Sequence, residues 1–143
     1  MPINVLVDTN FLLLPAQHRI DIFEELNKLL NCKVNVIVPL PVFNEILNLQ
    51  NSGKPLLSKQ ASLTLKIIKG KTIIDNAKID AKENVDDFIV RLASEKKCLV
   101  ATNDVLLRRK LRSENISVIF LRQMKYLQVE GGIDYSSILR RKT

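Results

Sequence analysis

Short apolar runs recur along the chain at intervals that suit the strands of a sheet. These runs are rich in β-branched residues and lie at 3–7, 34–38, 72–74, 99–101 and 118–121. Apolar runs of this length, bounded by polar or turn-forming residues, are typical of buried β-strands. The pattern therefore predicts a central sheet of about five strands.

Between these runs, apolar residues recur at the spacing of a helix. Phe23, Leu26 and Leu30 follow Asp21 in this way, and Pro41 is placed to begin a second helix. Further helices are predicted at 61–68, after the turn-forming sequence NSGKP, and at 85–97 and 105–112. Strands that alternate with helices form βαβ units, so we predict the α/β class with a parallel sheet.

The composition fits a single domain with an aliphatic core. The chain has 143 residues, of which 46% are hydrophobic and only 5% aromatic. We expect one domain spanning 1–143, with a short basic C-terminal tail from about residue 131. Cys32 and Cys98 are distant in sequence and lie next to apolar runs, so we expect buried, reduced thiols. With no apolar run long enough to span a membrane and no leader-like segment, we expect a soluble, cytoplasmic protein.

The charge of the chain favours polyanions as partners. Lys and Arg number 22 against 15 Asp and Glu, which gives a formal net charge of +7. Such an excess on a small domain is typical of proteins that bind nucleic acid. A charged, soluble surface without a polyanionic partner explains the composition equally well.

Polar residues follow two of the predicted strands directly. Asp8, Thr9 and Asn10 come after the first strand, and the sequence Thr102-Asn103-Asp104 follows the fourth. In open parallel sheets, ligands bind outside the carboxyl ends of the strands. We therefore expect the chemistry of this protein at that edge, with Asp8 and Asp104 taking part.

A third acid lies on the predicted helix 85–97. Residues three, four and seven positions after Asp86 are apolar, so its side chain is predicted to point toward the sheet. Asp87 lies about 100° further round the helix and is expected to be better solvated. An ordinary N-cap or first-turn acid is the alternative interpretation of either residue.

Glu45 repeats this arrangement one turn into its own helix, although a solvated glutamate is the alternative. Four acids from four separate segments form an oxygen-only set that suits Mg²⁺ or Mn²⁺. The chain's one histidine, His18, lies in a loop-like stretch, PAQHR, so zinc-type and Ser-His-Asp chemistry are not expected. Carboxylates around such a metal, in a basic protein, point to phosphodiester hydrolysis.

Four motifs in this order resemble the PIN-domain nuclease family. They are VLVDTN (5–10), PVFNEI (41–46), DDFIVRLA (86–93) and ATND (101–104), and they extend over nearly the whole chain. The resemblance implies a three-layer α/β/α fold and metal-dependent cleavage of single-stranded RNA. It assigns catalysis and Mg²⁺ or Mn²⁺ binding to Asp8, Glu45, Asp86 and Asp104. Supporting roles would fall to the polar residues beside them: Thr9, Asn10, Asp87, Thr102 and Asn103.

Within the family, the sequence after ATND resembles archaeal and eukaryotic PIN proteins of small-subunit ribosomal RNA processing. The toxin branch of toxin–antitoxin pairs shares the acids, and its partner would be a cognate antitoxin. Many PIN domains have a further acid where this chain has Leu106. That departure leaves open a second metal, and it motivates an alternative function as an RNA-binding ribosome-assembly factor with a silent site. An α/β phosphatase or receiver is disfavoured, because Asn10 stands where a phosphatase of that type has an aspartate.

Basic residues just beyond Asp104 are expected to hold RNA phosphates. They are Arg108, Arg109, Lys110 and Arg112. Such contacts supply salt-dependent affinity without reading sequence. A solvated helix face is the alternative. The expected partners are single-stranded RNA and either pre-ribosomal particles or an antitoxin, with no membrane; a homodimer is left open.

Overall fold

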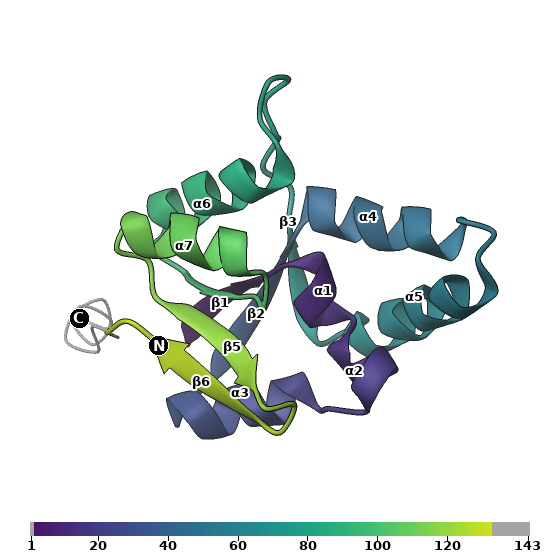
Figure 1. The fold of residues 1–143 in the computed structure, drawn as a ribbon, viewed down its shortest axis with the longest axis horizontal. Helices are drawn as coiled ribbons and strands as arrows, with labels where there is room; N and C mark the ends of the chain where they lie inside the picture. The colour runs from purple at the N-terminus through teal and green to yellow at the C-terminus, as the bar shows by residue number, and fades with distance from the viewer. Residues whose placement is uncertain (1, 133–143) are drawn as a thin grey trace.

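A computed structural model describes residues 2–132 of the chain as strands and helices in alternation. The predicted α/β class is confirmed (Figure 1). In chain order the elements are β1 (Ile3–Val7), α1 (Thr9–Leu12), α2 (Leu14–His18), α3 (Ile22–Leu30), β2 (Val34–Pro39), α4 (Leu40–Gln50), α5 (Pro55–Ile68), β3 (Thr72–Asp75), α6 (Val85–Lys96), β4 (Leu99–Ala101), α7 (Val105–Ser113), β5 (Val118–Arg122) and β6 (Tyr126–Glu130).

The six strands form one sheet in the order β3-β2-β1-β4-β5-β6. The strands β1 to β5 pair in parallel, whereas β6 pairs antiparallel with β5. The central strand β1 is in register with both neighbours, since Val5 lies opposite Val36 and Leu99. At its end Val7 lies opposite Ala101, so the residues that follow β1 and β4 emerge at the same edge.

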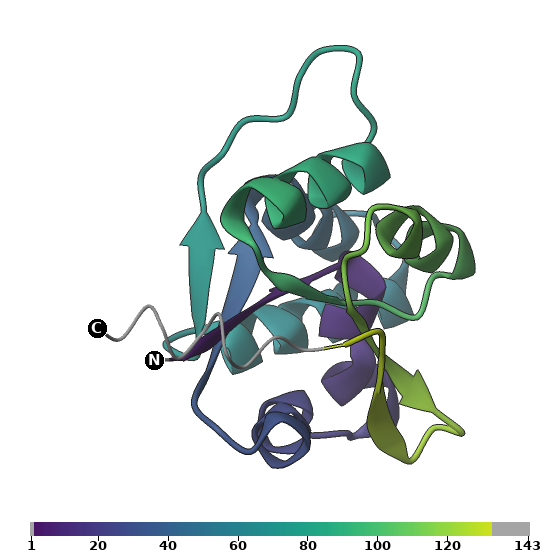
Figure 2. The same ribbon diagram turned by 90° about the vertical axis from the view of Figure 1, so that its left-hand side faces the viewer.

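The helices bury the sheet on both sides. In Figures 1 and 2, α6 and α7 lie together over one part of the sheet and α3 lies away from them, while α4 and α5 form a pair beside it. Val5, Leu6 and Val7 are fully buried, as expected for a central parallel strand covered on both faces. A long loop between β3 and α6 stands out from the body (Figure 2).

The structure differs from the sequence-based expectation in two helices, α2 and α5, and in one strand, β6. His18 lies at the end of α2, so its placement in a loop was wrong. Pro15 is tolerated there because a proline in the first helical turn needs no N–H partner. The helix α5 begins at Pro55 rather than at residue 61.

The strand β6 was not predicted either, because the turn before it carries no usual signal. Gln123 and Met124 both adopt a positive φ of 55°, a conformation that glycine or asparagine usually marks.

Other expectations concern the ends and the cysteines. Cys98 is buried as expected, whereas Cys32 is only half-buried. Within residues 2–132, no helix has the length and apolar character to cross a membrane. The basic tail expected from about residue 131 lies, beyond Gly132, outside the described residues.

Candidate active site

Asp8 connects β1 to α1 at the carboxyl end of the sheet. Its Oδ1 accepts the backbone N–H of Phe11 at 2.8 Å, so the side chain caps the first helix. Its Oδ2 accepts the hydroxyl of Thr102, which lies directly after β4. The carboxyl group is thereby held in one orientation between two strands, and only 7% of the residue is exposed.

Asp104 occupies the equivalent position between β4 and α7. Its Oδ1 accepts the N–H of Leu107 at 2.9 Å and caps α7, while its own N–H donates to the Thr102 hydroxyl at 3.0 Å. Asn103 fixes the same turn to β5, because its Oδ1 accepts the N–H of Leu121 at 2.7 Å. Thr102 therefore bridges Asp8 and Asp104.

Asp86 lies in the first turn of α6, whose cap is Asn84. The Asn84 side chain accepts the N–H of Asp87 at 2.8 Å, so neither aspartate is the N-cap. Asp86 is half-buried, whereas the Asp87 side chain is 54% exposed and pairs with Lys110 of α7 at 3.1 Å. This difference in burial agrees with the helix phase inferred from the sequence.

Glu45 approaches from α4 through a neighbour of Asp8. The hydroxyl of Thr9 donates to Glu45 Oε2 at 2.7 Å, which connects the fourth acid to the turn after β1. Asn10, by contrast, is exposed.

The pKa values of Asp8 and Asp86 are raised in part by the negative charges of neighbouring aspartates. Burial raises the pKa of Asp8 from 3.8 to about 6; hydrogen bonds from Thr102 and Phe11 oppose the rise, and the charges of Asp104 and Asp86 add to it. The pKa of Asp86 is also raised, by burial first and then by Asp104, while Lys110 lowers it. Three aspartates from different segments are thus close enough to affect one another, as a cation-binding site requires.

Whether these residues fit a divalent cation depends on their free oxygen atoms. Among residues 2–132, no group of three or more His, Cys, Asp or Glu side chains is arranged as a ready metal cage. Several carboxylate oxygens accept hydrogen bonds instead, including both of Asp8. Mg²⁺ needs no such cage, since it commonly takes one or two carboxylates and keeps its waters. The all-oxygen set therefore fits Mg²⁺ or Mn²⁺ and does not fit zinc.

The basic residues of α7 are not equivalent to one another. Arg108 stacks on Phe120, with the guanidinium 3.9 Å from the ring centre, and pairs with Glu130 at 2.7 Å. Arg112 donates to the carbonyl of Ile116 at 3.2 Å, and Lys110 pairs with Asp87. The side chain of Arg109 is exposed and forms no ion pair or hydrogen bond with any other described residue.

A further interaction near the site was not expected from the sequence. Arg91 of α6 forms two hydrogen bonds with Glu83, at 2.9 and 3.0 Å, and donates to the carbonyl of Lys78 at 3.0 Å. It thereby fastens the loop that leads into Asn84 and Asp86. The sequence carries no signal for this pair. It does carry one for the start of α6, because an asparagine three residues before Asp87 is typical of an N-cap.

Comparisons with known proteins relate the chain to one family. The family model described as a PIN-like domain matches residues 5–124. The chain is 33% identical over 132 residues to "Ribonuclease VapC4" of Methanocaldococcus jannaschii, covering 89% of this chain and 96% of that protein.

Two solved structures are also similar. The PIN domain endonuclease Utp24 superposes with a TM-score of 0.75 at 28% identity, covering 93% of this chain and 95% of that one. A domain of a functionally unknown protein from M. jannaschii, at 19% identity and a TM-score of 0.59, covers 92% and 99% respectively and supports the fold alone.

Proposed function

Since the chain belongs to the PIN-like domain family, we propose that it is an endoribonuclease that cleaves single-stranded RNA with the help of Mg²⁺ or Mn²⁺. The observation that carries the proposal is the buried Asp8 carboxyl, which interacts with the charges of Asp104 and Asp86. A buried acid beside two like charges is costly unless a cation compensates them. Asp8 and Asp104 also cap α1 and α7, so it is the cost of their combined charge, and not their position alone, that supports a cation site.

In this proposal Asp8, Glu45, Asp86 and Asp104 hold the cation, directly or through water. When bound, it lowers the pKa of a water molecule and offsets negative charge on the phosphate. The protein's own hydrogen bonds orient the acids: Thr102 and the N–H of Phe11 hold Asp8, and Thr9 holds Glu45. Asn103 supports the same turn through β5.

For the RNA, we propose ribosomal RNA precursors, with pre-ribosomal particles as partners. The proposal rests on the sequence after Asp104, LLRRKLR and VIFLRQMKYLQVEG, which resembles PIN proteins of that pathway. The identity to a protein named "Ribonuclease VapC4" favours a second candidate, a toxin-type ribonuclease controlled by an antitoxin. A third candidate, an RNA-binding assembly factor with a silent site, is motivated by Leu106.

The proposal is tested by cleavage of an end-labelled, unpaired RNA by the purified protein. We expect cleavage in Mn²⁺ or Mg²⁺, none in EDTA, and recovery when the metal is restored. Asp104→Asn should abolish cleavage while preserving the fold, because asparagine caps a helix as well as aspartate does. Retained RNA binding with no cleavage by the wild type would favour the silent-site function; cleavage unaffected by EDTA would exclude the metal-dependent mechanism.

A further inference from the structure

Two large apolar side chains are exposed beside the carboxylate cluster. Val105 and Leu106 form the start of α7, immediately after Asp104, and are 56% and 64% exposed. Neither is needed for the core, because Leu107 and Leu111 supply the buried face of the same helix. Adjacent exposed apolar residues at the rim of a charged site suggest a contact with a ligand.

The phase of α7 places Arg109 on the same outer surface. Val105, Leu106 and Arg109 lie within about 100° of one another around the helix, opposite the buried leucines. Arg108 is turned toward Phe120 and Glu130, and Lys110 toward Asp87. The outer surface therefore combines two apolar side chains with an arginine that makes no ion pair among the described residues.

This surface is next to the carboxylates that would act on a phosphodiester. Asp104 caps α7 and interacts electrostatically with Asp8 and Asp86. A phosphate held among these acids would bring the attached nucleoside to the first turn of α7. A cationic surface alone attracts any phosphate backbone, whereas apolar side chains can pack against the face of a base once it is unpaired and unstacked.

We propose that Val105, Leu106 and Arg109 form a nucleotide-binding surface. Val105 and Leu106 pack against an unpaired base next to the scissile phosphate, and Arg109 binds a neighbouring phosphate. The surface would make the protein select unpaired over duplex RNA. This inference rests on the proposed ribonuclease function and assigns part of its substrate selectivity to particular side chains.

The test measures binding of a 5′-fluorescent RNA of about 12 nucleotides, unpaired or annealed to its complement, over a range of salt concentrations in EDTA. We expect the wild type to prefer the unpaired RNA by about fivefold or more, a modest figure for the partial burial of two aliphatic side chains. The double variant Val105→Ser/Leu106→Ser should lose this preference without changing the salt dependence. Arg109→Ala should weaken both RNAs and reduce the salt slope by about one phosphate contact.

A matched control comes from α5, where Leu56 and Leu63 are 68% and 45% exposed. Leu56→Ser/Leu63→Ser removes a similar apolar area and should keep the preference. All four side chains are exposed, so melting temperatures should stay close to that of the wild type.

The outcomes separate this inference from the proposed function. If the wild type cleaves RNA but Val105→Ser/Leu106→Ser retains the preference for unpaired RNA, the inference is wrong and the ribonuclease function stands. An equal loss in the α5 control would also overturn it, because the effect would then be one of general hydrophobicity. If the wild type neither binds nor cleaves RNA, both proposals fall.

Discussion

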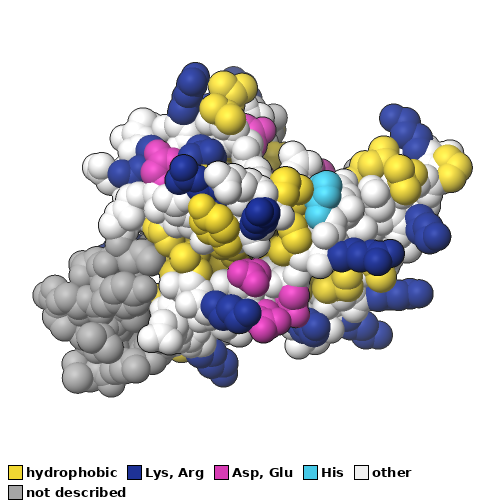
Figure 3. All heavy atoms as spheres, turned by 60° about the horizontal axis from the view of Figure 1, so that its bottom comes forward, with side chains coloured by type: hydrophobic (Ala, Val, Ile, Leu, Met, Phe, Trp, Pro, Cys, Tyr) yellow, Lys and Arg dark blue, Asp and Glu magenta, His cyan; other side chains and the backbone are white. Residues whose placement is uncertain are grey.

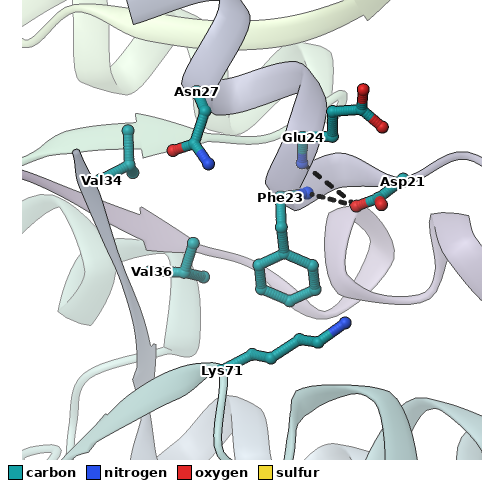
Figure 4. A pocket seen from close by; sticks show the side chains of 7 residues that line it. All are labelled: Asp21, Phe23, Glu24, Asn27, Val34, Val36 and Lys71. Atoms are coloured by element: carbon teal, nitrogen blue, oxygen red, sulfur yellow. Dashed lines mark hydrogen bonds between the residues drawn. The ribbon is translucent and has the colours of Figure 1, made fainter. Parts of the chain in front are cut away.

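Acidic residues lie at both ends of the parallel sheet, but only at the carboxyl end is one of them, Asp8, buried beside other acids. At the amino end, Asp21 and Glu24 line a cavity of about 370 Å³ with Phe23, Val34 and Lys71 (Figure 4). At the carboxyl end, Asp8, Asp86 and Asp104 form the candidate active site. Both regions contain acids, and they differ in burial and charge balance.

At the amino end, each acid has a partner or faces solvent. Asp21 accepts the N–H groups of Phe23 and Glu24, both at 3.1 Å, and caps α3. Glu24 pairs with Lys28 at 3.3 Å, and the Lys71 ammonium lies 5.5 Å from the centre of the Phe23 ring. On the face shown in Figure 3, acidic and basic side chains lie side by side.

The carboxyl end lacks this balance. Asp8 is buried beside two further aspartates, and Lys110, whose charge lowers the pKa of Asp86, is itself paired with Asp87. Acidic residues therefore indicate a site when a buried acid lies beside other acids without a matching number of basic side chains. Their number in the sequence is a weaker guide, because ordinary helix caps such as Asp21 are acidic too.

The largest expected effect concerns Asp86 and its neighbour. Asp86→Asn should reduce cleavage of unpaired RNA in Mn²⁺ by orders of magnitude, because metal-ion stabilisation of the reaction is worth several kcal/mol. RNA binding should survive, since the basic residues are unchanged. Initial rates and binding isotherms for the same variant provide the measurement.

Asp87→Asn and Asp21→Asn are the matched controls, because each removes the same charge. Asp87 faces Lys110 and solvent, and Asp21 lies at the other end of the sheet, so both variants should remain active. A larger loss in Asp87→Asn than in Asp86→Asn would show that the helix phase is off by one residue.

A smaller effect is expected on stability when the charge of Asp8 is removed. Between pH 3.8 and about 6 the folded protein retains a proton that the unfolded chain has lost, so the free energy of unfolding falls as pH rises through this window. The shift corresponds to about 3 kcal/mol, from which a lost hydrogen bond subtracts about 1 kcal/mol.

Asp8→Asn in EDTA should therefore raise the free energy of unfolding by about 1–2 kcal/mol at neutral pH. The gain should disappear below about pH 4, where the wild-type carboxyl is protonated in both states. Urea titrations at both pH values measure it. A gain that persists unchanged at low pH would mean that charge at Asp8 is not its cause.

Divalent metal should relieve the repulsion among Asp8, Asp86 and Asp104 in the wild type. Mn²⁺ at about ten times its dissociation constant should stabilise the folded state by about 1.4 kcal/mol, through mass action on the folded protein. The rise in melting temperature should be reduced in Asp86→Asn and unchanged in Asp21→Asn. An equal rise in all three proteins would indicate binding elsewhere.

Much of this contrast was accessible from the sequence because local rules apply at the carboxyl end. The end of a β-branched run located Asp8, and helix phase separated Asp86 from Asp87. The strands β1 and β2 were equally clear, since buried parallel strands are continuously apolar. These inferences need only residues that are near in sequence.

The remaining features depend on residues distant in sequence. The contact of Arg108 with Phe120 and Glu130 joins α7 to a hairpin that has no glycine or asparagine in its turn, so neither the hairpin nor the contact was predicted. The short helices α1 and α2 lie in the stretch TNFLLLPAQH, where the apolar residues are contiguous and do not reveal a period. The hydrogen bond from Thr102 to Asp8 was not predicted either, because it joins residues that follow two different strands and are distant in sequence.

The smallest expected effect tests the amino end by itself. Asp21→Ala removes the cap of α3 and should lower the free energy of unfolding by about 1 kcal/mol, opposite in sign to Asp8→Asn. Asp21→Asn is the control, because asparagine can still accept the N–H groups of Phe23 and Glu24. Urea unfolding with and without Mn²⁺ measures both variants, and the metal should stabilise each as much as the wild type. If Asp21→Ala abolished the stabilisation by Mn²⁺, the metal would bind at the amino end, and the assignment of the carboxyl end as the active site would be wrong.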